Sequence, residues 1–220
     1  MENKITELIN QSIKDGKDCM CNDNRFANEF ASIISKFNLN IFIETGSYLG
    51  HSSDLIKSLF PKLEIYSCDI NNSYVEIAKN GNDSINYEVK DSIPFLKEKI
   101  ELLNEKLLFI FLDAHGFGGD FPLEEELLLI GNSTKQFILC IHDCKIPNYN
   151  NFGYDTYGGV SISTELIEKT LKKTNCSFNI YIPSEQYSHF NLRGRCYVLI
   201  NPDKEMIRNM NDNKLLKGIL

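Results

Sequence analysis

The sequence predicts an α/β fold: a doubly wound, mostly parallel sheet of seven strands, with helices on both faces and the last strand antiparallel. Two observations support this prediction. From residue 40 onward, short apolar runs alternate with segments whose apolar residues recur at helical spacing, which is typical of a parallel sheet covered by helices. Near the end of the chain, only residues 183–194 separate two strand-like runs. That length suits an antiparallel hairpin better than a right-handed crossover.

The first 38 residues precede this alternation and are expected to form a helical extension. Apolar residues recur at helical spacing in two stretches, and the turn signal Asp15-Gly16-Lys17-Asp18 lies between them. We predict that this extension packs as a layer before the first strand. The alternative is that part of it closes over a substrate.

The remaining elements are expected in regular order. The predicted strands span residues 40–44, 63–68, 85–88, 107–112, 137–142, 177–182 and 195–200. The predicted helices span residues 52–60, 73–79, 92–103, 123–130 and 161–173. Ser92 is the expected cap of the third of these helices, because a hydroxyl followed by a proline in the first turn favours a helix start. Residues 203–220 form a polar tail with a few apolar residues, which either docks as a helix or frays.

The length, composition and charge of the chain indicate how many domains it forms and which kinds of partner are not expected. A chain of 220 residues, 42% of them hydrophobic, is expected to form one domain over residues 1–220, with its core at 39–202. The net charge is −7 and no basic stripe is present, so a nucleic-acid partner is not expected. The sequence has no signal-peptide core and no apolar run of about 18 residues, which predicts a soluble, cytoplasmic protein without a membrane partner. A homo-oligomer is left open.

The stretch from residue 41 to 53 combines a strand end, two glycines and a helix start. An apolar run ends at Glu44, passes through Gly46 and Gly50, and opens into a helical pattern. The glycines are expected to allow a tight turn and close approach of a ligand to the backbone. The free N–H groups of the helix then face the same place.

This motif, Glu44-x-Gly46-x-x-x-Gly50 after a buried strand, resembles motif I of the class I S-adenosylmethionine-dependent methyltransferases. Tyr48 stands where the usual form has a further glycine. The resemblance extends to the antiparallel last strand, and it implies a Rossmann-like fold with S-adenosylmethionine as the cofactor. The loop residues expected around the cofactor are Glu44, Gly46, Ser47, Tyr48, Gly50 and Ser52.

Two further strand ends are predicted to hold the adenosine part of the cofactor. Asp69 ends the second strand, where a carboxylate can accept both ribose hydroxyls, and Ile70 can flank the adenine. Asp69 falls 19 residues after Gly50, a spacing that also fits a dinucleotide site. After the third strand, Asp91 and Ser92 are expected near the adenine amine. The alternative for these two residues is ordinary helix capping.

The fourth and fifth strands end in Asp113-Ala114-His115 and His142-Asp143. An acid after an apolar strand is costly unless it faces a ligand, a cation or water. The pattern resembles the O-methyltransferases, including metal-dependent kinds, which implies that Asp113 and Asp143 hold Mg²⁺ or another divalent cation. Asp113 is also expected to face the cofactor.

Three residues are candidates for catalysis: His142, His115 and Asp143. Burial and the neighbouring carboxylate are expected to shift the pKa of His142 in opposite directions and nearly cancel. The imidazole would then accept a proton near neutral pH, as a general base requires.

The sequence therefore predicts a methyltransferase that acts on the hydroxyl of a small-molecule acceptor, a sugar or another natural product. One alternative is an NAD-dependent oxidoreductase, which would require a tighter Gly-x-Gly-x-x-Gly turn and a catalytic Tyr-Lys or Cys-His set. The other is a nucleotide-binding protein of the same fold without catalysis, in which the histidines and acids would scatter instead of converging.

Overall fold

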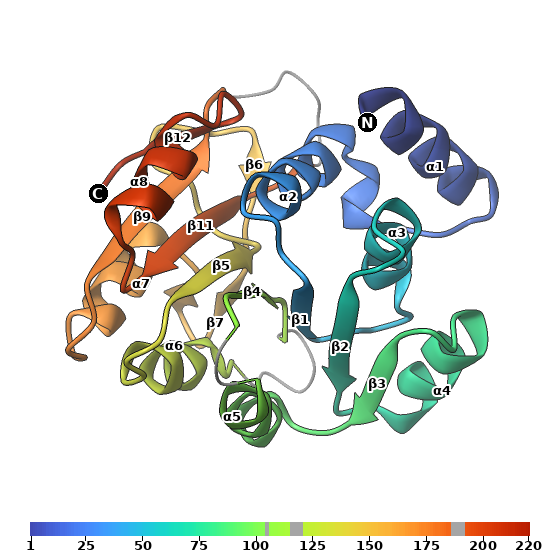
Figure 1. Cartoon of the computed structure of the whole chain (residues 1–220), viewed down its shortest axis with the longest axis horizontal. Helices are drawn as coiled ribbons and strands as arrows, with labels where there is room; N and C mark the ends of the chain where they lie inside the picture. Colours follow the sequence, from blue (N-terminus) through green and yellow to red (C-terminus); the bar gives the residue numbers. More distant parts are fainter. Residues whose placement is uncertain (104–105, 115–120, 186–191) are drawn as a thin grey trace.

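The computed structural model describes residues 1–103, 106–114, 121–185 and 192–220. Within these ranges the main sheet has eight strands (Figure 1). In spatial order they are β12 (Leu216–Gly218), β9 (Phe178–Pro183), β11 (Arg195–Ile200), β5 (Phe137–His142), β4 (Leu108–Leu112), β1 (Ile41–Thr45), β2 (Glu64–Asp69) and β3 (Asn86–Val89).

The directions of these strands confirm the predicted fold class. Strands β3, β2, β1, β4 and β5 pair in parallel. Strand β11 is antiparallel to both of its neighbours, β5 and β9, and therefore lies reversed within the sheet. Parallel strands buried on both faces read as continuous apolar runs. Accordingly, every residue of β1, β4 and β5 is buried.

The predicted number of seven strands is one too few, because the tail adds a strand. Residues 204–211 form a helix, after which β12 pairs antiparallel with β9 at the edge of the sheet. The side chain of Leu216 is buried there. The tail thus docks as a helix followed by a strand. Strand β12 has only three residues, which is too short for an alternating pattern to predict it from the sequence.

The helices begin at side-chain caps in several places. They are α1 (Glu2–Lys14), α2 (Asn24–Lys36), α3 (His51–Leu59), α4 (Asn72–Gly81), α5 (Ser92–Leu102), α6 (Leu123–Gly131), α7 (Thr164–Leu171) and α8 (Lys204–Asn211), with a short 3₁₀ segment η1 (Met20–Asn22). Asp23 caps α2 and Asp91 caps α5 by accepting backbone N–H bonds. The expected cap at Ser92 is therefore wrong by one residue, since Ser92 is the first residue of the helix.

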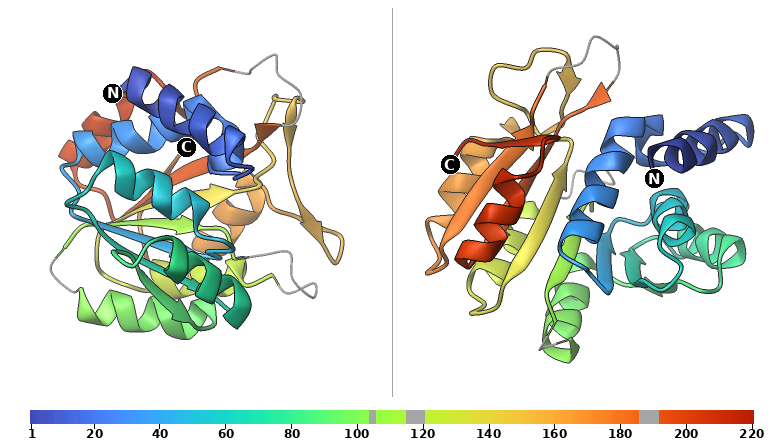
Figure 2. Two further views of the ribbon diagram at one scale, coloured as in Figure 1. Left: turned by 90° about the vertical axis from the view of Figure 1, so that its right-hand side faces the viewer. Right: turned by 45° about the horizontal axis from the view of Figure 1, so that its top comes forward.

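Helices cover both faces of the sheet, as the alternating pattern predicted (Figures 1 and 2). Buried residues of α1, α2, α3, α4 and α8 form one apolar cluster with one face of the strands. Buried residues of α5, α6 and α7 form a second cluster with the opposite face. The carboxyl ends of β1 to β5 therefore meet at one edge, between these two layers.

Four short strands lie beyond that edge. The strands β6 (Phe152–Gly153) and β10 (Leu192–Arg193) pair with each other, and β7 (Thr156–Tyr157) pairs with β8 (Val160–Ser161). The β7–β8 hairpin projects away from the main sheet (Figure 2). No helix in the described part of the chain is long and apolar enough to cross a membrane.

Candidate functional site

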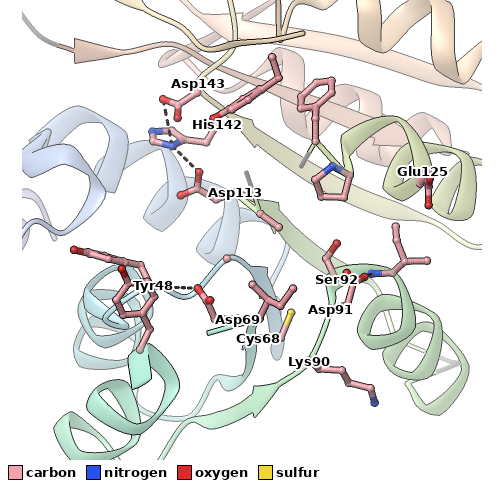
Figure 3. Close-up of a pocket in the computed structure, with 18 of the residues that line it drawn as sticks. Tyr48, Cys68, Asp69, Lys90, Asp91, Ser92, Asp113, Glu125, His142 and Asp143 are labelled. Atoms are coloured by element: carbon pink, nitrogen blue, oxygen red, sulfur yellow. Dashed lines mark hydrogen bonds and ion pairs between the residues drawn. The ribbon is translucent and has the colours of Figure 1, made fainter. Parts of the chain in front are cut away.

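A cavity of about 890 Å³ opens at the carboxyl ends of the parallel strands. Residues that follow each of the strands β1 to β5 line it, together with residues of α6 and of the segment before β7 (Figure 3). The lining residues at the strand ends are Gly46, Tyr48, Cys68, Asp69, Ile70, Lys90, Asp91, Ser92, Asp113, His142 and Asp143. Most of the predicted site residues therefore converge on one cavity. The alternative of a protein without catalysis predicted that these histidines and acids would be scattered.

Asp69 is held firmly at the end of β2. Its Oδ2 accepts the backbone N–H of Tyr48 at 2.8 Å, and its Oδ1 accepts that of Asn71 at 2.8 Å. Tyr48 has a positive φ of 47° in this turn. The motif I turn and the β2 end are thus fixed to each other, and the carboxylate is oriented before any ligand arrives. The neighbouring Ile70 side chain is exposed and lines the cavity.

Ser92 provides a test of whether the cavity suits an adenosine group. Its hydroxyl is buried, lines the cavity, and has no hydrogen-bond partner within the described ranges. Because a buried hydroxyl without a partner is costly, this one fits a polar atom of a ligand. The neighbouring Asp91 carboxylate accepts the N–H of Ile93 as the α5 cap. Asp91 therefore has the capping role and also lines the cavity.

A smaller pocket of about 180 Å³ lies beside the cavity and shares Gly46, Tyr48, Asp113 and His142 with it. Ser47 and Glu44 line this pocket, and the Ser47 hydroxyl is another buried group without a partner among the described residues. Ser52 also lines it, but its hydroxyl accepts the N–H of Met20. The donors and acceptors here suit the amino-acid end of the cofactor, so the residues present fit S-adenosylmethionine.

Glu44 is a buried acid with neutral partners. The hydroxyls of Ser53 and Ser67 donate to its Oε2 at 2.7 and 2.6 Å. Burial raises the pKa of Glu44 to about 8, although the two hydroxyl bonds act in the opposite direction. Burial therefore favours the protonated form of the Glu44 carboxyl.

The two motif glycines have a packing role that the sequence did not predict, and Gly46 also lines both cavities. A Cβ at Gly46 would lie 2.3 Å from the Asp113 carbonyl oxygen, so Gly46 allows the loops after β1 and β4 to touch. A Cβ at Gly50 would lie 2.4 Å from the Tyr87 hydroxyl, which donates to the Gly50 carbonyl. Both glycines have a positive φ, as predicted for a tight turn.

Gly46→Ala is expected to lower the free energy of unfolding by about 2–4 kcal/mol, because it combines a clash with backbone atoms and a left-handed φ. Gly158→Ala is the matched control. Gly158 also has a positive φ, but nothing lies within 4 Å of its Cβ position. Chemical denaturation of both variants measures the difference, and equal losses would show that the contact with Asp113 contributes nothing.

Asp113, His142 and Asp143 form a compact cluster at the ends of β4 and β5 (Figure 3). His142 Nδ1 lies 2.9 Å from Asp113 Oδ1 and 3.6 Å from Asp143 Oδ1. Its Nε2 lies 3.4 Å from the Sγ of Cys21. The ring of Phe26 stacks on the imidazole, with 5.4 Å between centroids.

The expected near-cancellation of the His142 pKa shifts is wrong. Burial lowers the pKa, but the Asp113 charge and hydrogen bond outweigh it, and the pKa of His142 is raised well above its usual value. The Asp113 carboxylate therefore favours the protonated form of the imidazole. The other candidate base, His115, lies outside the described residues.

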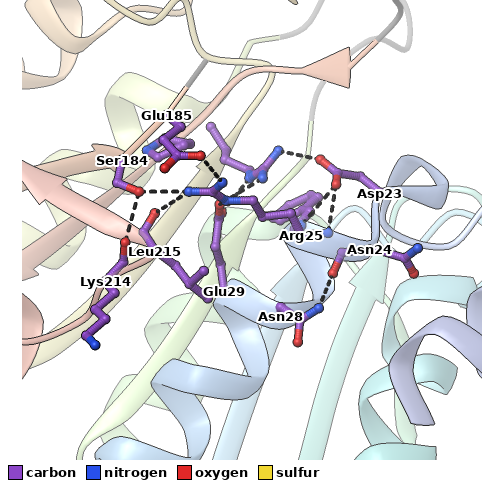
Figure 4. Close-up of polar contacts among 12 residues, drawn as sticks. Asp23, Asn24, Arg25, Asn28, Glu29, Ser184, Glu185, Lys214 and Leu215 are labelled. Carbon is purple, nitrogen blue, oxygen red and sulfur yellow. Dashed lines mark hydrogen bonds and ion pairs between the residues drawn. The ribbon is translucent and has the colours of Figure 1, made fainter. Parts of the chain in front are cut away.

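The N-terminal extension contributes to the site as well as to the packing layer. Met20, Cys21 and Phe26 line the smaller pocket. Helix α2 is fixed to the sheet by Arg195, which is completely buried and donates to Glu29 and Asp23. Figure 4 labels these two acids among the polar contacts of α2. Sequence reasoning missed Cys21, because only the folded chain brings it to His142.

Asp113 and Asp143 are the residues predicted to hold a divalent cation. Ligand atoms of Asp113, His142 and Asp143 lie within 4.8 Å of one another, which is compact enough. However, Arg193 donates from Nε to Asp143, so a fixed positive charge already occupies this acid. As arranged here, the residues do not fit a divalent cation.

Comparisons with known proteins give matches only among solved structures, since no family model and no curated protein matches the sequence. An amino pentose methyltransferase of calicheamicin biosynthesis from Micromonospora echinaspora, bound to S-adenosylmethionine, matches with a TM-score of 0.54 and 10% identity over 80% of this chain and 89% of that one. The O-methyltransferase TomG from Streptomyces achromogenes matches at 0.53 and 9% over 90% of each chain.

An O-methyltransferase from Bacillus cereus, in complex with S-adenosylhomocysteine, matches at a TM-score of 0.52 and 13% identity over 90% of each chain. A candidate O-methyltransferase from Nostoc punctiforme matches at 0.51 and 13%, and this chain spans 55% of its length. At these identities the likeness concerns the fold. The strand order, the reversed β11 and these neighbours agree: the chain has the fold of the class I S-adenosylmethionine-dependent methyltransferases.

Proposed function

We propose that this protein transfers a methyl group from S-adenosylmethionine to a hydroxyl of a small molecule, with a sugar or another natural product as the acceptor. One observation carries the proposal: a single cavity joins residues suited to adenosine with residues suited to proton transfer. Asp69 and Ser92 lie toward one part of it, and the Asp113–His142 pair lies toward another.

Each group has a defined task in this proposal. Asp69 accepts the ribose hydroxyls and Ser92 bonds the adenine, while Ser47 bonds the amino-acid end. The cofactor supplies an electron-poor methyl group, so alignment of the acceptor is the main task of the protein. The neutral form of His142, which is hydrogen-bonded to Asp113 and faces the cavity, takes the proton of the acceptor hydroxyl.

The acceptor class is inferred from the wall beyond this pair. The rings of Phe121 and Tyr157 stack at 5.4 Å and line the cavity, and Asp155 accepts the Tyr157 hydroxyl at 2.9 Å. Aromatic faces beside carboxylates suit a ring that carries several hydroxyls. One structural neighbour acts on an amino pentose, which supports this choice. The proposal thus has two parts: that this protein catalyses methyl transfer, and that its acceptor is a molecule of this class.

Asp69→Asn is expected to weaken S-adenosylhomocysteine binding by about 10–150-fold, since it removes the charge from ribose hydrogen bonds worth roughly 1.5–3 kcal/mol. Asparagine keeps an oxygen for a backbone N–H, so the turn at Tyr48 is disturbed less than in an alanine variant. Calorimetry measures the affinity, with the melting temperature as a control. Unchanged affinity would contradict the ribose assignment.

The same calorimetry separates the alternatives when S-adenosylmethionine, S-adenosylhomocysteine and NAD are titrated in parallel. Binding of NAD alone would favour the oxidoreductase, for which Asp69 is equally suited. Binding of S-adenosylhomocysteine without methyl transfer to any hydroxyl compound of a broad panel would favour a binding protein of the same fold. A divalent cation is not part of the proposal, because the Arg193 guanidinium already occupies Asp143.

A further inference from the structure

Arg193 connects two acids that come from different segments at the acceptor end of the cavity. Its Nε donates to Asp143, directly after β5, and its Nη2 donates to Asp155, between β6 and β7. Both acids line the cavity. The Asp143 side chain is only 10% exposed, and that of Arg193 is 31% exposed, so these ion pairs are partly shielded from water.

The backbone fixes the same three residues. The Asp155 N–H donates to the Asp143 carbonyl at 3.1 Å, and Asp143 has a positive φ of 53°. Gly194, next to Arg193, accepts the Cys144 N–H at 2.9 Å and donates to the Gly153 carbonyl at 2.8 Å. Backbone hydrogen bonds therefore hold the segment of Arg193 beside the segment of Asp143 and beside the segment of Asp155. This arrangement differs from an exposed ion pair between flexible side chains.

The position of Arg193 matters because its partner Asp143 belongs to the one cluster in the described part of the chain that could hold a metal ion. A cation on Asp113, His142 and Asp143 would lie close to the guanidinium on Asp143. Two positive charges at that separation repel each other, and the low local dielectric strengthens the repulsion. Arginine keeps its charge at every relevant pH, so the repulsion is permanent.

We propose that Arg193 is the fixed cation of the acceptor end: it holds Asp143 and Asp155 in place of a divalent ion, and the site works without a metal. Arg193 thereby acts as a positioning residue, because it orients Asp143 beside His142 and orients Asp155 beside the Tyr157 hydroxyl. The statement that catalysis needs no metal rests on the proposed methyl transfer. The occupation of Asp143 by Arg193 is independent of that function.

Binding of Mn²⁺ tests the proposal without any need for activity. The protein is stripped with EDTA and dialysed, and free Mn²⁺ is measured by electron paramagnetic resonance up to about 1 mM, the weak end of specific divalent-ion sites. We expect no binding by the wild type or by Arg193→Lys, which keeps the charge. Arg193→Met should gain one Mn²⁺ site, and Arg193→Met combined with Asp143→Asn should lose it again.

Arg208→Met is the matched control, because Arg208 is exposed and lies 3.9 Å from Glu205 on α8. It should bind no Mn²⁺. If Arg193→Met fails to fold, Arg193→Gln takes its place, since the amide retains a donor without the charge. Mn²⁺ binding by the wild type that Asp143→Asn removes would overturn the proposal, and so would a folded, uncharged Arg193 variant that gains no site.

The activity measurement is kept separate. Methyl transfer by the wild type should be unchanged in EDTA, and loss of transfer that Mg²⁺ or Mn²⁺ restores would overturn the metal-free site. Failure of the proposed function would be seen differently, as no S-adenosylhomocysteine binding in calorimetry, and it would leave the Mn²⁺ result intact.

Discussion

Replacement of His142 by alanine is expected to lower turnover by about 10²–10⁴-fold, the usual contribution of a positioned proton acceptor. Cofactor affinity should remain nearly intact, because His142 contacts Asp113, Asp143, Cys21 and the ring of Phe26, whereas Asp69 and Ser92 lie at the ends of other strands. His142→Asn separates two roles. Asparagine can still donate to Asp113, but it cannot accept a proton.

The pH dependence provides a second readout for His142. Its folded-state pKa is raised, so the imidazole must lose a proton before it can act as a base, and kcat/KM should rise with pH along a limb above pH 6.5. Asp113→Asn removes the main cause of the raised pKa and should move that limb to lower pH. Full activity of both His142 variants would mean that the acceptor proton leaves to another group. If neither His142 variant yields folded protein, the role of His142 is structural.

The stability of the protein is expected to fall as pH rises from 4.5 to 8 because of Glu44. In this range the unfolded chain releases the Glu44 proton, whereas the folded protein retains it, since the folded pKa is about 8. Folding then binds a proton, and each further pH unit disfavours it. The full difference corresponds to roughly 5 kcal/mol, at about 1.4 kcal/mol for each pKa unit.

Glu44→Gln imitates the protonated acid and should remove this dependence. The variant should match the wild type near pH 4.5 and exceed its free energy of unfolding by several kcal/mol near pH 8. Urea denaturation at several pH values measures the gap, and Glu7→Gln, at an exposed position of α1, is the control. A constant gap across this range would show that Glu44 is ionised in the folded protein. Calorimetry of Glu44→Gln with S-adenosylhomocysteine would then test the predicted cofactor contact.

The arrangement of the sheet was largely predictable because the signals that carry it are local. Buried strands are continuous apolar runs, and β5 and β11 begin and end as predicted. The short connection before β11 was enough to predict its reversed direction. The convergence of Asp69, Asp113 and His142 on one edge then follows from topology, since parallel strands place their carboxyl ends together.

The chemistry of these residues depended on contacts between distant parts of the chain. Arg195 pairs with Glu29 across 166 positions, and Arg193 pairs with Asp143 across 50. Neither spacing has a local signature, so neither pair can be found from the sequence alone.

The sequence by itself determined the alternation of strands and helices, the antiparallel closure of the sheet and the residues at its functional edge, because periodicity and chain connectivity are properties of short stretches. Only the tertiary structure decided the direction of the pKa shifts of His142 and Glu44, the packing role of Gly46 and the occupation of Asp143 by Arg193. These properties depend on burial and on distances between charges, and the folded chain alone sets both.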